Sequence, residues 1–347
     1  MKKLRVFQTV KTTDAARGGS SLCSIKRSVP GFFTKSLGTV LLFLLMIPYL
    51  ITFLFGNLKE GEEKPAVLRD LDTTSEEDFM IVNETVLGVE EIPLELYVAD
   101  RLARSIDHDF EMEVLKAQAV LIRSGLLLSA AESGAGIRAI HVADEDYGTM
   151  QGTERIYEAA AQTKGVYLAY ENQPVSGSFF AVSNGATRNG EELGLTEYPY
   201  LKSVSCSRDF LSKDYANSVR YDENEFERIW DKTLSFQITE EEILENENIL
   251  KEKGIGDICL YRDSAGYVLY LARGEKFVSG EQFRDAYLLS SSSFHFIEEE
   301  TKIIITSEGV GHGLGMSQYA ANEMAKEGED YIKILGYFFP DTSMKKL

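Results

Sequence analysis

Cysteine is scarce in this chain, with three thiols, Cys23, Cys206 and Cys259, among 347 residues. No two of them form a C-x-x-C motif, and none lies in a Cys and His cluster of zinc spacing. The sequence therefore excludes a disulfide framework and predicts no structural metal site and no cofactor. Whether Cys206 and Cys259 form a bridge stays open, since two cysteines permit a disulfide without requiring one.

Positive charge is also in deficit. The chain has 36 Lys and Arg against 55 Asp and Glu, a formal net charge of −19. A protein with this balance repels DNA and other polyanions as a whole, which argues against a nucleic-acid partner. The hydrophobic content of 44% excludes a disordered or collagen-like chain and indicates a globular protein.

The charges are distributed unevenly around one long apolar segment. Residues 1–36 contain eight Lys and Arg and a single acid. Residues 37–56 (LGTVLLFLLMIPYLITFLFG) are 20 residues without a charge, enough for a helix across the roughly 30 Å hydrocarbon core of a bilayer. A cleaved signal peptide is the alternative, but its apolar region is usually about 7–15 residues and ends in a small-residue cleavage site. We therefore predict an uncleaved transmembrane helix.

The positive-inside rule gives this helix an orientation, with the basic N-terminus cytoplasmic and residues 57–347 outside. The outer part then carries a formal charge of −26. Residues 57–78 are rich in acids and lack a hydrophobic period, which predicts a solvated linker. The expected organisation is a cytoplasmic tail (1–36), a transmembrane helix (37–56), an acidic linker (57–78) and one outer domain (79–347).

Short strands and helices are expected from residue 79 onward. Pro93 is placed to start a helix over 94–105, and Asp109 to cap a second helix with helical spacing of its apolar residues. Two hairpins are expected, over 165–182 and 259–273, and 223–253 reads as an acidic, helical surface. Strands and helices do not alternate as βαβ units. The fold class expected is therefore α+β, a single-pass N-terminal transmembrane helix followed by one mixed helix and antiparallel-sheet ectodomain.

The densest local signal is GVGHGLGMSQY (309–319), where alternating glycines surround His312. Such glycines let a backbone approach a neighbouring group closely. Ser317 can cap the helix that follows, and Asp330 the next one. A dinucleotide or phosphate loop would need a βαβ unit or a G-K-[ST] sequence, and the position near the C-terminus provides neither. For His312 alone, a buried structural imidazole is the alternative to a role in a site.

The longer segment GVGHGLGMSQYAANEMAKEG resembles the C-terminal signature of the stage II sporulation protein D family, also called the amidase-enhancer domain. The resemblance covers about residues 79–345, and a basic head with one anchor helix is also the layout of that family. Six other blocks follow the order of the family: IPLELYV (92–98), LKAQAV with a later Arg (115–123), TKGVYLAY (163–170), FFAVSNGATRNGEE (179–192), YPYLKSV (198–204) and SGEQFRDAYLLSSSSF (279–294).

This resemblance implies peptidoglycan chemistry. Sporulation members of the family are lytic transglycosylases that cut glycan strands, denuded of stem peptides by a partner amidase, during engulfment. One carboxylic acid protonates the glycosidic oxygen and then acts as base while the 6-hydroxyl of the sugar closes an anhydro ring. The implied partners are glycan strands, the amidase and the stage II sporulation proteins P and M. The implied location is the mother-cell membrane, facing the intermembrane space.

The catalytic glutamate of the family is replaced in this chain. Laid on the family pattern without gaps, RSIDHDFEMEVLKAQAV places Ser105 at the position of the glutamate. A serine hydroxyl cannot donate a proton at neutral pH as a tuned carboxylic acid does. Asp107 is the candidate substitute, whereas Asp109 and Glu111 suit a helix cap and a first turn.

Two further departures concern Phe180, which stands where the family commonly has His, and residues 143–152, which lack the Cys and His of a metal-binding stretch. No metal site is carried over. Lys116 and Arg123 are seven residues apart and hence on one helix face, with ordinary solvated positions as the alternative. The positions expected to bind substrate are Lys116, Gln118, Arg123, Ser183, Gly185, Arg188, His312, Ser317 and Gln318.

Two hypotheses follow. The first is an anchored, outward-facing protein of this family that acts on peptidoglycan glycan strands, with its enzymatic activity left uncertain by Ser105. The second is a catalytically degenerate, glycan-binding scaffold that stimulates a partner amidase.

Overall fold

The computed structural model describes residues 71, 79–133, 139–235 and 238–347. The predicted tail, transmembrane helix and nearly all of the linker lie outside these residues. Among the described residues, one helix, over Met112–Glu132, is long and apolar enough to cross a membrane, with a mean hydropathy of 1.4. Most of that helix is buried inside the protein, so it is a core helix and does not bear on the predicted anchor.

The described residues form eight α-helices, fifteen strands and two short 3₁₀ helices. The helices are α3 (Leu94–Ser105), α4 (Met112–Ser133), α5 (Glu154–Gln162), α6 (Glu223–Lys232), α7 (Glu240–Leu244), α8 (Gly280–Ala286), α9 (Gln318–Lys326), α10 (Tyr331–Phe338), η1 (Gly190–Leu193) and η2 (Ser207–Leu211). The strands are β1 (Met80–Thr85), β2 (Gly88–Pro93), β3 (Ala139–Val142), β4 (Val166–Tyr170), β5 (Gln173–Pro174), β6 (Phe179–Phe180), β7 (Ala216–Asp222), β8 (Leu250–Lys253), β9 (Cys259–Arg262), β10 (Val268–Arg273), β11 (Lys276–Ser279), β12 (Phe294–Glu299), β13 (Lys302–Glu308), β14 (Met316–Ser317) and β15 (Ser343–Lys346).

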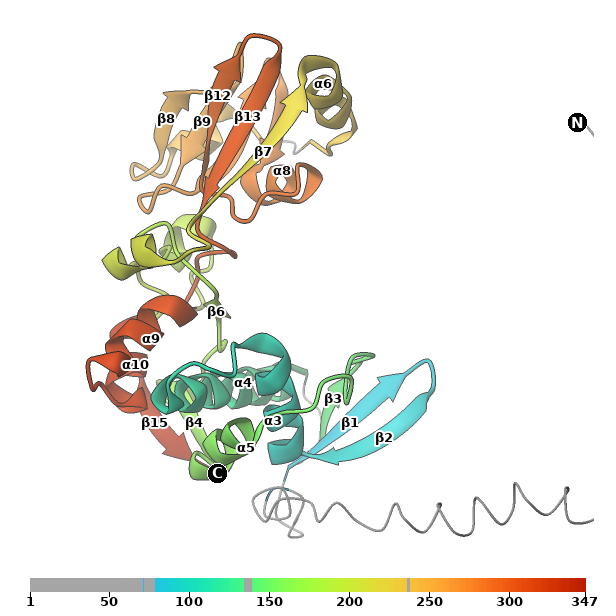
Figure 1. Ribbon diagram of the computed structural model, residues 1–347, viewed down its shortest axis with the longest axis vertical. Coiled ribbons are helices and arrows are strands. Elements are labelled where there is room, and N and C mark those ends of the chain that lie inside the picture. Colours follow the sequence, from blue (N-terminus) through green and yellow to red (C-terminus); the bar gives the residue numbers. More distant parts are fainter. Residues whose placement is uncertain (1–70, 72–78, 134–138, 236–237) are drawn as a thin grey trace, which may run out of the picture. The chain divides into compact units, whose positions relative to one another are not determined.

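A first hydrophobic core forms around α4 (Figure 1). Val114, Leu115 and Leu121 of α4 are fully buried, and α3, α5, α9 and α10 pack against this helix. The C-terminal strand β15 pairs with β4 in antiparallel orientation, with Met344 opposite Leu168. The first core therefore combines residues from both ends of the described chain.

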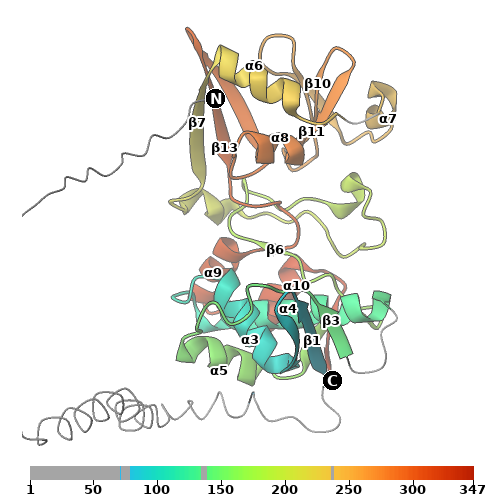
Figure 2. The same cartoon turned by 90° about the vertical axis from the view of Figure 1, so that its right-hand side faces the viewer.

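A second core lies among the strands β7 to β13 (Figure 2). Strands β8 to β11 form a four-stranded antiparallel sheet, and β7, β12 and β13 form a three-stranded one, with α6 and α8 packed beside them. Phe226, Phe283 and Phe294 are buried here, and their rings contact one another and Tyr287, as aromatic pairs in cores do. All residues of this core lie between positions 219 and 305, so it is inserted in the sequence of the first core.

The structure confirms a mixed α and β protein with several antiparallel sheets. Two parallel pairings occur as well, β1 with β3 and β6 with β14. Pro93 directly precedes α3 as predicted, and both predicted hairpins form, as β4–β5 and β9–β10. Glu171 and Asn172 in the first of these turns have positive φ angles of 47° and 68°, which a tight two-residue hairpin requires.

Three local predictions were wrong. Helix α4 begins at Met112 and not directly after Asp109, because the N–H groups of its first turn bond to the carbonyl of Glu111. The second strand of the first hairpin is interrupted, since β5 pairs with β4 whereas β6 pairs with β14 of the glycine-rich loop. In the acidic segment 223–253, α6 and α7 form as predicted, but residues 250–253 form β8, which pairs with β9, so strand pairing overrides the local helical tendency at its end.

Candidate functional site

Ser105 ends α3 and lies beside two glutamines from distant parts of the chain. Gln118 Nε2 donates to the hydroxyl of Ser105 (2.8 Å) and to its carbonyl (3.2 Å). Gln318 Nε2 donates to the same carbonyl (2.7 Å) and to Oε1 of Gln118 (2.7 Å). Gln118 and Gln318 are buried, whereas Ser105 is half-buried. Hydrogen bonds thus join three predicted site residues directly, and these contacts use both N–H groups of each amide.

The loop between Ser105 and α4 is fixed at several points. Arg155 of α5 donates to two of its backbone carbonyls, at 3.0 and 2.7 Å. The N–H of Glu111 donates to Oδ1 of Asn322 in α9 (2.9 Å). Asp107 is exposed, and its Oδ1 accepts the N–H of the residue two positions later (3.0 Å). Helices α5 and α9 therefore hold in place the loop that carries Asp107.

Asp209 joins two further predicted positions. It is fully buried, and its Oδ2 accepts the N–H of Ser183 (2.6 Å) and the hydroxyl of Ser317 (2.7 Å). Its other oxygen is buried without a hydrogen-bond partner in the part of the chain that the structure describes. Burial raises the pKa of Asp209, because a carboxylate loses hydration there. Gly185, another predicted position, has a φ of +117° and lies against the ring of Phe210. A Cβ atom at position 185 would lie only 2.6 Å from that ring.

The glycine-rich loop packs its backbone against the segment that follows β5. Gly315 has a φ of +78°, and a Cβ there would collide with the carbonyl of Ser178. Gly313 has a φ of +80°, and a Cβ would lie 2.9 Å from the side chain of Arg188. Both positions need glycine for conformation and for space. This packing brings His312 to Arg188, whose Nη1 lies 3.4 Å from the carbonyl oxygen of His312.

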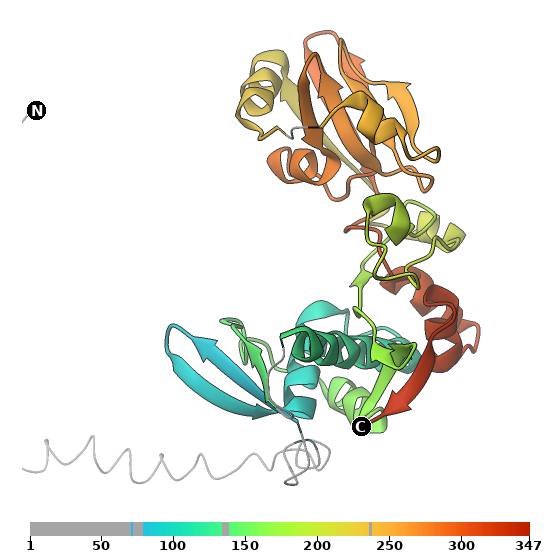
Figure 3. The same cartoon turned by 180° about the vertical axis from the view of Figure 1, so that it is seen from behind.

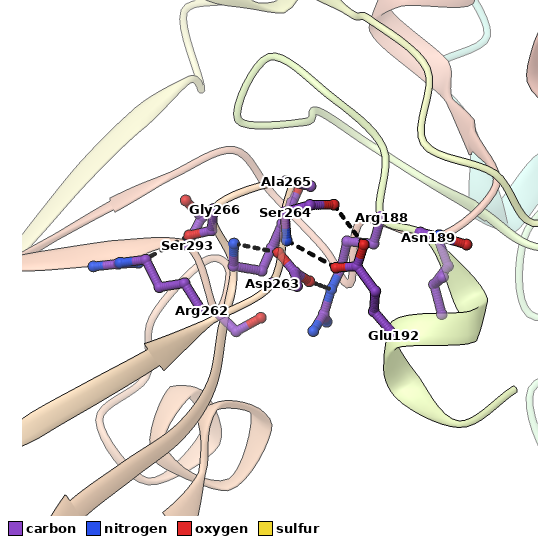
Figure 4. Close-up of polar contacts among 12 residues, drawn as sticks. Arg188, Asn189, Glu192, Arg262, Asp263, Ser264, Ala265, Gly266 and Ser293 are labelled. Atoms are coloured by element: carbon purple, nitrogen blue, oxygen red, sulfur yellow. Dashed lines mark hydrogen bonds and ion pairs between the residues drawn. The ribbon is translucent and has the colours of Figure 1, made fainter. Parts of the chain in front are cut away.

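Arg188 is held by ionic contacts with the buried Asp263 (Figure 4) and with the partly exposed Glu281. It is 2% exposed, its Nε donates to Oδ2 of Asp263 (2.6 Å), and its Nη1 contacts Glu281 (3.1 Å). Its guanidinium group lies over the ring of Tyr267 at 5.0 Å. Figure 4 shows the β9–β10 turn reaching both Arg188 and Glu192, whose carboxylate accepts two hydrogen bonds from this turn (2.8 and 2.7 Å). The second core is therefore joined to the predicted site loop through polar contacts.

The other two predicted cations are also paired. Lys116 contacts the carboxylate of Glu113 at 2.6 Å and is partly exposed. Arg123 is fully buried, with its Nε and Nη2 on the two oxygens of Glu95 (3.0 and 2.5 Å) and its Nη1 on the carbonyl of Val166 (2.6 Å). The burial of Arg123 corrects the expectation that it lies at the surface. The helix face that Arg123 shares with Lys116 is covered by other elements at the position of Arg123.

The surroundings of the half-buried His312 favour its neutral form. Burial lowers its pKa, against a smaller opposing effect of Glu281. The N–H of Leu314 donates to its Nδ1 (3.1 Å), which assigns the proton of the neutral ring to Nε2. The ring lies 5.7 Å from that of Phe180, measured between centroids. A backbone hydrogen bond to Phe179 engages this Nε2–H group, so the ring is held at both nitrogens.

A pocket of about 600 Å³ opens beside Arg188 and Glu281. Its lining also includes apolar side chains, a few neutral polar ones, and the carboxylates of Glu191, Glu192, Glu242 and Glu245. Within the described residues, no group of three His, Cys, Asp or Glu side chains is arranged to hold a metal ion. Cys206 and Cys259 are both free thiols.

Sequence reasoning missed the residues that hold this site together. Asp209, Arg155 and Asn322 each act on a partner far away in sequence, from 26 positions for Asp209 and Ser183 to 211 for Asn322 and Glu111. No local pattern marks such a pairing, because hydrophobic period and capping rules concern neighbours within a few residues.

Known proteins resemble the chain over most of its length. A sequence model described as "Stage II sporulation protein" matches residues 82–170. Stage II sporulation protein D of Bacillus subtilis (strain 168) is 28% identical over 344 residues, which cover 90% of this chain and 96% of that protein. The protein of the same name from Bacillus amyloliquefaciens is 31% identical over 270 residues, 73% of this chain and 74% of that protein. An amidase enhancer of Bacillus subtilis (strain 168) is 24% identical over 273 residues, 68% of this chain and 38% of that protein.

The mixed α and β fold, the glycine-rich loop and these relatives define a class, that of sporulation proteins related to an amidase enhancer. Within this class, the chain belongs to the stage II sporulation protein D family.

Proposed function

We propose that this chain is a membrane-anchored protein that acts on denuded glycan strands of peptidoglycan during engulfment in sporulation. Residues 37–56 span the mother-cell membrane in this proposal, with the N-terminus in the cytoplasm and residues 79–347 facing the intermembrane space. The uncharged segment of 20 residues after eight Lys and Arg supports the anchor and its orientation. Membership of the stage II sporulation protein D family supports engulfment as the process and peptidoglycan as the substrate class.

The hydrogen-bonded group of Ser105, Gln118 and Gln318 carries the proposal for the site. Gln118 and Gln318 match two separate family blocks, Ser105 stands at the position of the family's glutamate, and hydrogen bonds of 2.7–3.2 Å join the three residues. Ser105 and Lys116 are only partly buried, so they can contact a sugar. Of the other predicted positions, Gln118, Ser183, Arg188, Ser317 and Gln318 are buried, and Gly185 and His312 are half-buried, so in this proposal they act mainly by holding the surrounding loops in place.

Glycan binding without cleavage fits this geometry best. Lytic cleavage needs a carboxylic acid at the position of Ser105, and the described side chains bonded to its hydroxyl and carbonyl are amides. Loss of such an acid costs about 10²–10⁴-fold in rate. The protein would then present the glycan strand to a partner amidase, with the stage II sporulation proteins P and M as its partners. The relative named amidase enhancer supports this role.

Cleavage by a substitute acid is the second candidate, and the exposure of Asp107 favours it. Its carboxylate lies two residues after Ser105 in the same loop and is open to solvent. The contacts from Arg155 and Asn322 oppose the shift of two positions that this role requires.

Incubation with denuded glycan strands separates the two candidates, with mass spectrometry for anhydromuramoyl products and co-sedimentation for binding. We expect the natural chain to bind strands and release no such product. Ser105→Glu should release product, because it returns an acid to the family position, whereas the uncharged Ser105→Gln should not. Product from the natural chain that disappears in Asp107→Asn contradicts binding without cleavage and supports the substitute acid. A chain that neither binds nor cleaves strands contradicts both.

A further inference from the structure

The β1–β2 hairpin has an apolar tip that other described residues leave uncovered. Val86 and Leu87 form its two-residue turn and are 90% and 94% exposed, and Val89 at the start of β2 is 69% exposed. Turns of this kind usually carry Asn, Asp or Gly. Figures 1 and 3 both show the hairpin extending away from α3 and α4. Three neighbouring exposed aliphatic side chains on one projection are typical of a contact surface.

Strand β2 also lies at the edge of its sheet. The strand order is β2–β1–β3, so among the described residues no strand pairs with β2 on its outer side. In a two-residue hairpin the residues on either side of the turn, here Thr85 and Gly88, form hydrogen bonds with each other. Every second pair along the ladder is not hydrogen-bonded, which here includes the pairs that contain Val89 and Glu91. The backbone groups of Val89 and Glu91 therefore point to the open side. Such an edge can accept an added strand from another chain.

The charge beside this edge selects the kind of strand that fits. Glu84, Glu90 and Glu91 are exposed on the hairpin. A pocket of about 230 Å³ lies over the hairpin and is lined by the apolar Leu87 and Val89, by Glu90, and by Glu145, whose carboxylate also accepts the N–H of Val86 at 3.0 Å. A Lys or Arg side chain suits this lining, because its aliphatic part can lie on the apolar side chains while its charge meets the carboxylates.

A second copy of this chain does not fit the same edge. Two β2 strands paired edge to edge would bring Glu90 and Glu91 of one copy close to those of the other, and like charges across strands are destabilising. The acidic edge thus disfavours self-association and favours a basic partner.

We propose that the outer edge of β2 and the tip at Val86 and Leu87 bind an extended, basic segment of the partner amidase as an added strand. This inference rests on the proposed function, in which the chain stimulates an amidase. It adds the surface that recognises the enzyme, which is separate from the glycan surface around Ser105.

Two variants test this surface by different routes. Leu87→Asp removes apolar contact at the tip, and Val89→Pro removes an outward N–H while it leaves the ladder to β1 intact. Leu234→Asp is the matched control, since Leu234 is also exposed, at 73%, but lies on α6's C-terminal side in the second half of the chain. The full chain in detergent is mixed with the purified sporulation amidase, and the release of stem peptides from peptidoglycan is measured.

We expect Leu87→Asp and Val89→Pro each to weaken binding of the amidase at least tenfold and to abolish its stimulation, with glycan co-sedimentation unchanged. Leu234→Asp should behave as the natural chain. Stimulation that survives in both hairpin variants overturns the proposed surface and leaves the proposed function in place. A natural chain that does not stimulate the amidase overturns the proposed function itself. The hairpin variants could instead lose a dimer, or lose binding to phosphatidylcholine vesicles, while the amidase is unaffected. Either result would mean that the tip binds a second copy of the chain or a lipid surface, and would also overturn the proposal.

Discussion

Arg123→Met should lower the free energy of unfolding by about 3–5 kcal/mol, the usual cost of removing one partner of a buried ion pair. Arg123 is fully buried, and its two bonds to Glu95 measure 3.0 and 2.5 Å. Without it, the carboxylate of Glu95 keeps one neutral partner, the N–H of Gly165 at 3.0 Å. The carbonyl of Val166 also loses its bond from Nη1, at 2.6 Å. The loss arises chiefly from a charge left in the core.

Urea unfolding followed by circular dichroism measures this change. Lys116→Met on the same helix is the matched control, because its partly exposed pair with Glu113 should be worth less than about 1 kcal/mol. The double variant Glu95→Leu with Arg123→Met should regain much of the loss, since an apolar pair leaves no buried charge. An Arg123→Met protein of natural stability with weakened glycan binding would refute the core position and return Arg123 to the surface.

Two further predictions concern titratable groups. Burial lowers the pKa of His312, so the unfolded chain binds the extra proton and stability should fall as pH drops below about 6.5. His312→Gln should flatten the loss between pH 7 and 5 in urea midpoints, and a slope equal to that of the natural chain would contradict this. Burial raises the pKa of Cys206 to about 12, so only about one thiol in 10⁴ is ionised at pH 8. Iodoacetamide should therefore modify the partly exposed Cys259 before Cys206, as peptide mapping can show, and equal rates for these two thiols would contradict the burial of Cys206.

Local chemistry in the sequence predicted much of the fold. Ser317 and Asp330 cap α9 and α10 through their side chains, as their residue types suggest. The residue types in the turns of the β4–β5 and β9–β10 hairpins likewise indicate where the chain reverses direction. These features depend on contacts within about four residues, which a sequence shows directly.

The site depends on contacts that the sequence does not show. Lys116 and Arg123 are seven residues apart, a spacing that predicts one shared face of α4. Lys116 is nevertheless partly exposed and Arg123 lies in the core, because different elements cover α4 along its length. Family blocks indicated that Gln118 and Gln318 belong to one site, but not that their amides would bond to each other. The buried Asp209 had no signal, since its partners lie in other segments.

The first core has a consequence for how this chain is made. Strand β4 cannot pair with β15 until residues 343–346 have been synthesised, and α4 cannot pack against α9 and α10 until those helices have been made. At about 5–20 residues per second, the interval between positions 170 and 343 is roughly 10–35 s. The second core, within positions 219–305, is complete before then. During synthesis the inserted core can therefore fold before the first core, which closes only after α9, α10 and β15 have been made.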